Sequence, residues 1–194
     1  MNYTFNIARA MAANKSTYIY DYLFEYLPTT ADRDATDSEW DNRQLVWSFK
    51  NDPNRRCRFS YEEALYRIVP AYEDLLRDNF GDSCSELTLV CIPASNSNKN
   101  ERRWKEFSDQ VCSDLDMYNG YYYIKVTGSA VARHLGGSGS PSLLFDKDYF
   151  KGKKVVICDD VKTTGRSIQT MRERLQSMGA TVVGAITIAK TVRD

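Results

Sequence analysis

The fold of this chain is decided by the stretch Val155-Val156-Ile157-Cys158-Asp159-Asp160-Val161-Lys162-Thr163-Thr164-Gly165-Arg166-Ser167. Its first four residues form a continuous apolar run, which is typical of a buried parallel strand and too short for a helix. Two carboxylates follow at the end of that strand, and residues 163–167 form a small turn rich in hydroxyl groups. Apolar residues at helical spacing then predict a helix over residues 166–178. Ligands of open α/β sheets bind at the carboxyl ends of strands, and helix N-termini attract phosphate, so the stretch predicts an anion site.

Other apolar runs place this stretch in a larger sheet. Residues 87–92, 121–126 and 181–189 read as further strands, and residues 153–158 form the central one. From residue 87 onward these strands alternate with helical patterns. Such alternation indicates an α/β fold with a mainly parallel sheet and right-handed crossovers.

The first 60 residues are read as an N-terminal appendage or hood, and residues 61–194 as the core of a single globular domain. Within the appendage, the apolar and aromatic spacing of residues 18–27 predicts an amphipathic helix that stops before Pro28. Residues 29–39 read as a polar loop, and residues 44–49 as a short apolar element. Ser60 and Glu63 form a capping box that opens a helix ending near residue 80, with a kink or a late start at Pro70.

Composition bounds the class of protein. The chain has 194 residues, with 26 basic and 26 acidic side chains, which gives no electrostatic case for nucleic acid or an anionic membrane. No apolar run reaches the length of a membrane span, and residues 1–13 do not resemble a signal peptide, so we expect a cytoplasmic protein. Five cysteines without a C-x-x-C pair, together with one histidine, argue for reduced thiols rather than a zinc site.

Two loops are candidates for function. Residues 93–100 are small and polar and follow the strand at 87–92, and the next helix begins with Arg102, Arg103 and Lys105. Cations oppose the dipole of a helix N-terminus, so either a negative ligand lies nearby or these are solvated charges. Residues 127–142 are rich in glycine and predict a functional loop. Arg133 and His134 lie inside it, and a structural role for the histidine stays open.

Two other classes of phosphate or acidic site do not fit. A receiver domain carries its acidic pair near the N-terminus, whereas only 34 residues follow Asp160 here. The G-x-x-x-x-G-K-[ST] spacing of a P-loop is absent.

The stretch at 155–167 resembles the signature that type I phosphoribosyltransferases use for 5-phosphoribosyl-1-pyrophosphate (PRPP). That signature is a hydrophobic run, two acidic residues, two variable positions and then Thr-Thr-Gly-x-Ser/Thr. The ComF-like branch is the most similar, through the segments at 47–50, 91–93, 101–107 and 150–154. Its N-terminal zinc-binding cysteine cluster and the Gly-Phe-Asn of its helix start are missing. The resemblance implies a three-layer α/β fold with a central, mainly parallel sheet.

The resemblance also implies roles for individual residues. The 5-phosphate would lie against Lys162, Thr163, Thr164, Gly165, Arg166 and Ser167. The catalytic group would comprise Asp159 and Asp160, which face the ribose hydroxyls, and Arg133, which with Lys125 is a candidate for charge on the leaving group. The pyrophosphate would lie against Ala94, Ser95, Asn96, Lys99, Arg102 and Arg103. Mg²⁺ would be carried mainly by substrate oxygens and water, with Asp159 or Asp160 as its protein contact. Residues 127–142 would be the lid that excludes water.

The resulting hypothesis is Mg²⁺-dependent transfer of the phosphoribosyl group to a nitrogen acceptor, with release of pyrophosphate. The alternative is a non-catalytic, PRPP-binding regulatory protein, or a ComF-like protein associated with DNA uptake. The partners implied are PRPP and an acceptor that the sequence does not identify, and a homodimer is left open.

Overall fold

The computed structural model describes residues 18–127 and 142–192, and its centre is a five-stranded sheet in the order β1-β7-β6-β2-β3. Every pairing in this sheet is parallel. The strands are β1 (Ile19–Tyr26), β2 (Leu87–Cys91), β3 (Tyr118–Asn119), β6 (Lys154–Lys162) and β7 (Thr181–Thr191). The predicted parallel α/β fold is therefore confirmed.

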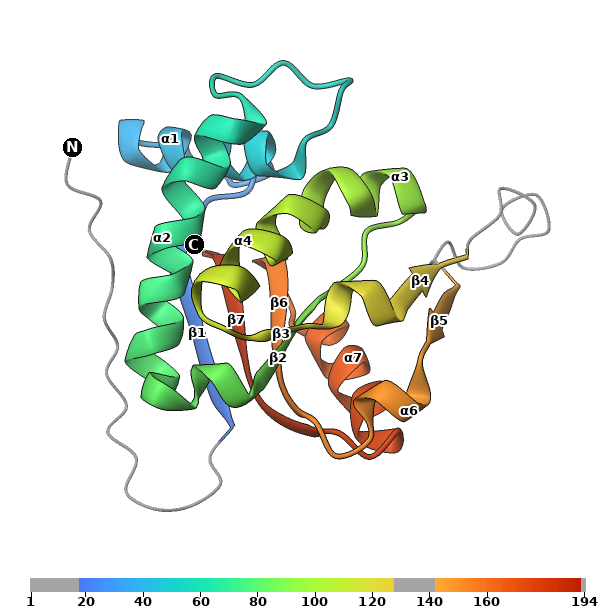
Figure 1. The fold of residues 1–194 in the computed structure, drawn as a ribbon. Helices are drawn as coiled ribbons and strands as arrows, with labels where there is room; N and C mark the ends of the chain where they lie inside the picture. The colour runs from blue at the N-terminus through green and yellow to red at the C-terminus, as the bar shows by residue number, and fades with distance from the viewer. Residues whose placement is uncertain (1–17, 128–141, 193–194) are drawn as a thin grey trace.

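Helices cover both faces of the sheet (Figure 1). One face packs against α1 (Asp37–Lys50), α2 (Tyr61–Phe80) and α4 (Glu106–Asp114). The other face packs against α7 (Arg166–Ser177) and the short helix α6 (Lys147–Phe150). Because the strands between them are buried from both sides, they read as continuous apolar runs rather than as alternating ones.

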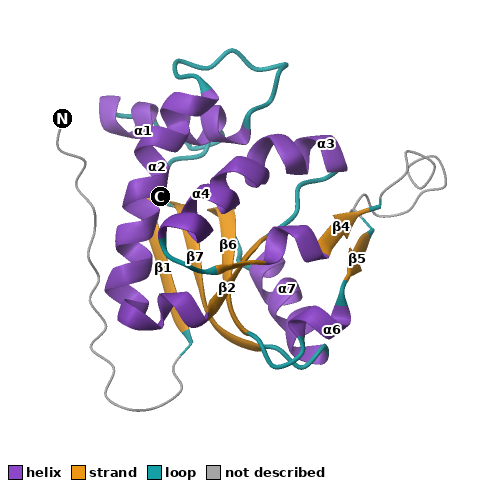
Figure 2. Cartoon of the chain, viewed as in Figure 1, coloured by secondary structure: helices purple, strands orange, loops and turns teal. Residues whose placement is uncertain are grey.

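Residues 121–126 form a strand only in part. Gly120–Tyr123 is a 3-10 turn, η3, and only β4 (Ile124–Val126) is extended. It pairs antiparallel with β5 (Leu143–Phe145) in a second, two-stranded sheet that lies apart from the main one (Figure 2). The Asn119 side chain accepts a hydrogen bond from the Tyr121 amide at 3.0 Å, which fixes the turn where the chain leaves the main sheet.

The helix predicted for residues 18–27 is wrong, because this segment is the edge strand β1, paired along its length with β7. The apolar and aromatic residues of this segment recur at the three- and four-residue spacing of a helical face. They also recur at the two-residue spacing of one face of a strand. In the structure Tyr20 and Tyr22 stack at 6.3 Å between ring centroids, while Leu23 is buried in the core between the sheet and α2. Residues 19–26 thus belong to the main sheet. The division of the chain into an appendage (1–60) and a core (61–194) stays a prediction.

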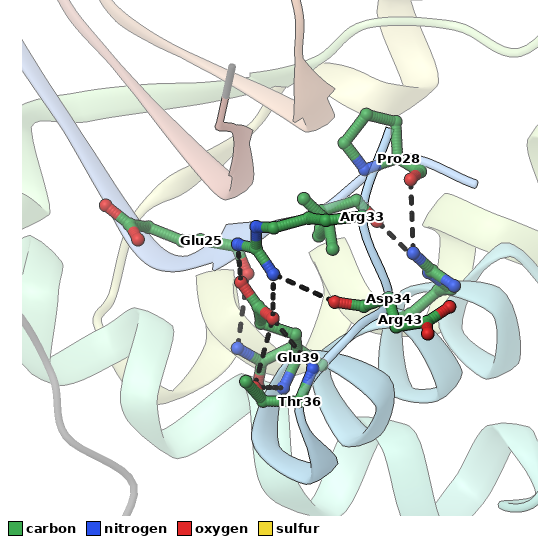
Figure 3. A network of polar contacts seen from close by, with 9 residues as sticks. Glu25, Pro28, Arg33, Asp34, Thr36, Glu39 and Arg43 are labelled. Atoms are coloured by element: carbon green, nitrogen blue, oxygen red, sulfur yellow. Dashed lines mark hydrogen bonds and ion pairs between the residues drawn. The ribbon is translucent and has the colours of Figure 1, made fainter. Parts of the chain in front are cut away.

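Helix α1 begins at Asp37, earlier than predicted, and includes the end of the predicted loop at 29–39. Thr36 is its N-cap and forms a capping box with Glu39, which also accepts two hydrogen bonds from Arg33 (Figure 3). Arg43 donates to the carbonyls of Leu27 and Pro28 at 3.1 Å each. These contacts fasten the end of β1 to α1.

Helix α2 follows the prediction closely. Ser60 and Glu63 form the expected capping box, and the helix runs to Phe80 without a break at Pro70. Near its C-terminus, η1 (Gly81–Glu86) leads into β2. Across the described part of the chain, no helix is both long and apolar enough to cross a membrane. The five cysteines are free thiols, and four of them are buried.

Candidate functional site

The site lies where β2 turns away from β6. Cys91 and Cys158 are the last paired residues of these strands, and the Ile92 amide donates to the Cys158 carbonyl at 2.8 Å. Beyond that point β6 continues along β7 as far as Lys162. The two carboxylates were predicted to lie just after the strand, whereas the structure extends the strand through them. Asp159 and Asp160 therefore lie at the carboxyl end of the sheet, where β2 and β6 separate, the usual ligand position in such folds.

The two carboxylates point to opposite faces of the sheet, because successive side chains of a strand alternate. Cys158, two residues before Asp160, belongs to the core beside α1 and α2. Ile157, two residues before Asp159, belongs to the core beside α7. Asp160 thus faces α1, and Asp159 faces the side of the loop that leads into α7.

Asp160 is 7% exposed and holds two cations. Its Oδ2 forms an ion pair with Arg103 Nη1, and its Oδ1 lies 3.7 Å from Lys50 Nζ. Cationic partners at these positions offset the cost of burying the charge of a carboxylate.

Asp159 is only half-buried, yet it holds its proton more tightly than an ordinary aspartate. Burial, and then the charge of Asp160, raise the pKa of Asp159 to about 7. The Asp160 amide, which donates to Asp159 Oδ1 at 2.9 Å, opposes this rise, as do Lys50 and Arg103. A cation or a hydroxyl donor at this carboxylate would favour its ionised form.

The predicted phosphate loop joins β6 to α7. Gly165 has a φ of 78°, in the left-handed region, and is the N-cap of α7. No side chain caps the first turn of this helix, and the Arg166 amide makes a long contact of 3.4 Å with Thr164 Oγ1. Thr163, Thr164, Arg166 and Ser167 are exposed. Free amides, hydroxyls and the positive end of the helix dipole suit a phosphate group.

Lys162 does not lie in the open loop with its neighbours. Its Nζ lies 3.6 Å from the centroid of the Tyr20 ring, on the α7 side of the sheet. Burial, and then the neighbouring charge of Lys190, lower the pKa of Lys162.

The second predicted loop, after β2, is held by its own side chains. The Ala94 amide donates to Asn100 Oδ1 at 2.9 Å. Asn96 caps the short helix α3 (Ser97–Asn100) by accepting from the Lys99 amide at 2.9 Å. The chain then continues into the π-helical segment η2 (Glu101–Lys105), a rare conformation that is frequent at functional sites. Ser95 is exposed between these elements.

A cavity of about 290 Å³ lies beside this loop. Its wall is lined by Tyr26, Thr29, Trp47, Lys50, Asp52, Arg55, Lys99 and Arg103. Four of these side chains are cationic and one is acidic, so we name it the basic cavity. The Arg55 guanidinium lies over the Trp47 ring at 4.0 Å from its centroid. Trp47 Nε1 in turn donates to the Tyr26 hydroxyl at 3.3 Å.

The structure distributes the predicted pyrophosphate residues over different surfaces. Lys99 and Arg103 line the basic cavity, whereas Arg102 lines a separate hollow of about 490 Å³ with several acidic side chains. The predicted catalytic Arg133, with His134, lies outside the described residues. Lys50 and Arg55 were not assigned to the site from the sequence. The aromatic-lysine segment at 47–50 was the available signal for Lys50, and nothing in the sequence marked Arg55.

The described residues do not supply a metal cage of their own. Within residues 18–127 and 142–192, no group of three or more His, Cys, Asp or Glu side chains could hold a metal ion. Asp159 and Asp160 are adjacent hard oxygen donors, a set that suits Mg²⁺ held mainly by phosphate oxygens and water.

Comparison with known proteins gives one match to a family and several to solved structures. Residues 99–193 match the family described as phosphoribosyl transferase domain, and this range includes both carboxylates and the loop at 163–167. No curated protein sequence matches the chain.

Among solved structures, phosphoribosylpyrophosphate synthetase from Mycobacterium smegmatis is similar at 17% identity and a TM-score of 0.40, over 63% of this chain and 34% of that one. Purine phosphoribosyltransferase from Pyrococcus horikoshii Ot3 is similar at 19% identity and a TM-score of 0.38, over 65% of this chain and 70% of that one. UMP synthase from Leishmania donovani is similar at 18% identity and a TM-score of 0.45, over 80% and 32%. The chain thus spans about a third of the length of the first and third of these proteins.

Proposed function

We propose that this protein binds PRPP and transfers its phosphoribosyl group to a nitrogen acceptor, releasing pyrophosphate, because residues 99–193 match the family described as phosphoribosyl transferase domain. The observation that carries the proposal is the position of two carboxylates on β6, between an uncapped helix N-terminus and a cavity lined by four cations. PRPP has the same three parts in the same order, which are a phosphate, a ribose with hydroxyls and a pyrophosphate.

The 5-phosphate would bind at residues 163–167. Gly165 lets the backbone turn so that amides and the hydroxyls of Thr163, Thr164 and Ser167 converge on one anion. The N-terminus of α7 adds its partial positive charge. Lys162 would stabilise the phosphate through its charge rather than through direct contact, because its Nζ lies over the Tyr20 ring. Direct contact would require the lysine side chain to move away from that ring.

The ribose would bind between the two loops, with Asp159 and Asp160 accepting hydrogen bonds from its hydroxyls. In the reaction the bond between C1 and the pyrophosphate oxygen breaks and the oxygen keeps the electron pair. The acceptor nitrogen then forms a bond to C1 and loses a proton. Positive charge develops on the ribose in the transition state, and nearby carboxylates stabilise it.

The pyrophosphate would bind at the basic cavity, whose wall includes Lys99 of α3 and Arg103 of η2. Ala94, Ser95 and Asn96 would shape the loop around it, while Arg102 would contribute only if it turned away from its separate hollow. Bound Mg²⁺ would supply charge neutralisation on the phosphate oxygens, with Asp159 or Asp160 as its protein ligand.

Arg133 and the lid at 127–142 stay part of the proposal as the sequence predicts them, together with a hood for the acceptor within residues 1–60. A closed lid would keep water from C1, since water is a competing acceptor. The ComF-like relationship and the cytoplasmic location also remain proposals, supported by the sequence segments and the free cysteines.

Calorimetric titration with PRPP and Mg²⁺ tests the proposal. We expect wild-type protein to bind and the double variant Asp159→Asn/Asp160→Asn to lose most of the affinity. Lys154→Ala is the control, because Lys154 lies at the opposite end of β6 in a surface pair with Glu86. No heat with wild type, or equal heat from the double variant, would remove the PRPP assignment.

Turnover separates the enzyme from the non-catalytic alternative. We expect pyrophosphate release when a panel of purine, pyrimidine and amine acceptors is offered with PRPP. Tight PRPP binding without release for any acceptor would instead support a regulatory protein that keeps the site.

A further inference from the structure

Asp160 draws its two cationic partners from distant parts of the chain. Lys50 is the last residue of α1, and Arg103 lies in η2. Each cation takes a different oxygen of the same carboxylate. Both acceptor atoms of Asp160 are thus engaged in the ligand-free protein, although the proposed function needs them for the ribose.

The same two cations also line the basic cavity. Their side chains are 35% and 17% exposed, so both can be reached from the cavity side. Arg103 Nε is buried and has no hydrogen-bond partner among the described residues. A guanidinium carries five donors, so Arg103 retains capacity for a second anion.

Contacts to the backbone fix where these side chains start. Asn51, next to Lys50, donates from Nδ2 to the Arg102 carbonyl at 3.2 Å. The Tyr61 hydroxyl donates to the Arg103 carbonyl at 2.8 Å. The end of α1, the start of α2 and η2 are therefore joined, and a change of partner needs only rotation of two long side chains.

We infer that Lys50 is a pyrophosphate-binding residue. In the ligand-free protein Lys50 and Arg103 pair with Asp160, and a bound pyrophosphate group takes the place of Asp160 as their anionic partner. This inference rests on the proposed function. Pyrophosphate carries more negative charge than one carboxylate and offers more acceptor oxygens, so the two cations gain by moving to it. The exchange frees both oxygens of Asp160 for the ribose hydroxyls. Binding at the pyrophosphate end thereby prepares the ribose end.

The exchange makes a prediction that a purely structural ion pair does not. Removing the charge of Asp160 takes away the competitor for the two cations, so inorganic pyrophosphate should bind more tightly to Asp160→Asn than to wild type. We expect a gain of about fivefold to tenfold, the scale of one charge-assisted hydrogen bond. Ribose 5-phosphate should show no such gain with the same variant, because it carries no pyrophosphate to bind the two released cations.

Calorimetric titrations with inorganic pyrophosphate and, separately, with ribose 5-phosphate test this. Lys50→Ala should weaken pyrophosphate binding about tenfold and should not weaken ribose 5-phosphate binding, because the change frees Asp160 Oδ1. Lys154→Ala, the control at the far end of β6, should change neither. Thermal melting of each variant without ligand confirms that the compared proteins are folded.

The outcomes separate the inference from the proposed function. Equal pyrophosphate affinity in wild type, Lys50→Ala and Asp160→Asn would overturn the inference while ribose 5-phosphate binding still supports the function. Weaker pyrophosphate binding by Asp160→Asn would also overturn it, since the carboxylate would then help rather than compete. Absence of binding for both ribose 5-phosphate and PRPP would remove the proposed function, whereas the pyrophosphate series would still decide the exchange.

Discussion

Gly165 lies so close to Lys162 in the predicted phosphate loop that a side chain at position 165 would press on the lysine. A Cβ added to Gly165 would lie 3.2 Å from Lys162 Cε, and the φ of Gly165 is 78°. The Lys162 side chain is held in place because its Nζ lies over the ring of Tyr20 in β1. The shape of the loop therefore depends on the contact between this lysine and β1.

Replacing this glycine should damage the loop more than the fold. For Gly165→Ala we expect a loss of stability of about 1–2 kcal/mol, the usual cost of a left-handed non-glycine residue. Because the amides would move, we also expect ribose 5-phosphate to bind about tenfold more weakly in calorimetry. Gly152→Ala is the matched control, since Gly152 has a φ of 75° and no atom within 4 Å of its added Cβ. Equal loss of binding in both variants would contradict this role for the loop.

Asp159 should make the ligand-free protein less stable at higher pH. Burial raises its pKa from the ordinary 3.8 to about 7, so the folded state holds a proton that the unfolded state has released. The free energy of unfolding should therefore fall as the pH rises from about 4 to about 7 and change little above that.

Asp159→Asn should remove that slope. Urea unfolding at pH 5 and pH 8 should show a difference for wild type that is absent from the variant. The variant should be more stable than wild type at pH 8 by at most about 4 kcal/mol, since the rise in pKa spans about three units and each unit corresponds to about 1.4 kcal/mol. Lys50 lowers the pKa of Asp159, so Lys50→Ala should raise that pKa further and enlarge the difference in stability between pH 5 and pH 8. Identical slopes in wild type and Asp159→Asn would show that another group is responsible.

The central stretch was predictable from sequence because its structure is mostly local. The apolar run of β6, the glycine turn and the spacing of α7 each leave a pattern within a few residues. The edge strand β1 was not predictable in this way. Its spacing fits a helix as well as a strand, and its pairing with β7, some 165 residues later in the register of Ile19 with Gly184, decides between them.

The two ends of α1 differ for the same reason. Thr36 and Glu39 carry the same capping signature that located α2 at Ser60, so the start of α1 was within reach of sequence reasoning. The pairing of Lys50 with Asp160 was not predictable from the sequence, because the two residues are 110 positions apart in the chain. Only the packing of α1 on the sheet brings them together.

The capping network of α1 should make the stability of the fold depend on pH in the acidic range (Figure 3). Hydrogen bonds from Arg33 and then from the Thr36 amide lower the pKa of Glu39 to about 2. A lowered carboxyl pKa stabilises the folded state above the ordinary value of 4.5, and this contribution is lost as the pH falls towards 2. Glu39→Gln should therefore be less stable at pH 7 and lose less stability between pH 5 and pH 3, measured by thermal melting.

Thr36→Ala should cost about 1 kcal/mol at pH 7, the usual effect of removing an N-cap hydroxyl. Asp37→Asn is the matched control, because Asp37 lies in the same first turn and is not the N3 partner of the capping box. A control as unstable as Glu39→Gln would indicate that general helix charge, rather than the cap, is responsible.

Gly184 tests the assignment of residues 19–26 to the sheet. A Cβ added to Gly184 of β7 would lie 2.7 Å from the Ile19 carbonyl oxygen, 3.2 Å from Ile19 Cβ and 3.3 Å from Phe80 Cζ. The first of these atoms is backbone, so β1 would have to move for the methyl group to fit. We expect Gly184→Ala to lower the free energy of unfolding by about 1–3 kcal/mol, as other overpacked substitutions do. Thr181→Ala, at the exposed start of the same strand, should change the free energy of unfolding little.

Because Tyr26 at the far end of β1 lines the basic cavity, displacement of the strand should also weaken the binding of inorganic pyrophosphate. Wild-type stability in Gly184→Ala would mean that β1 does not pack against β7 as described.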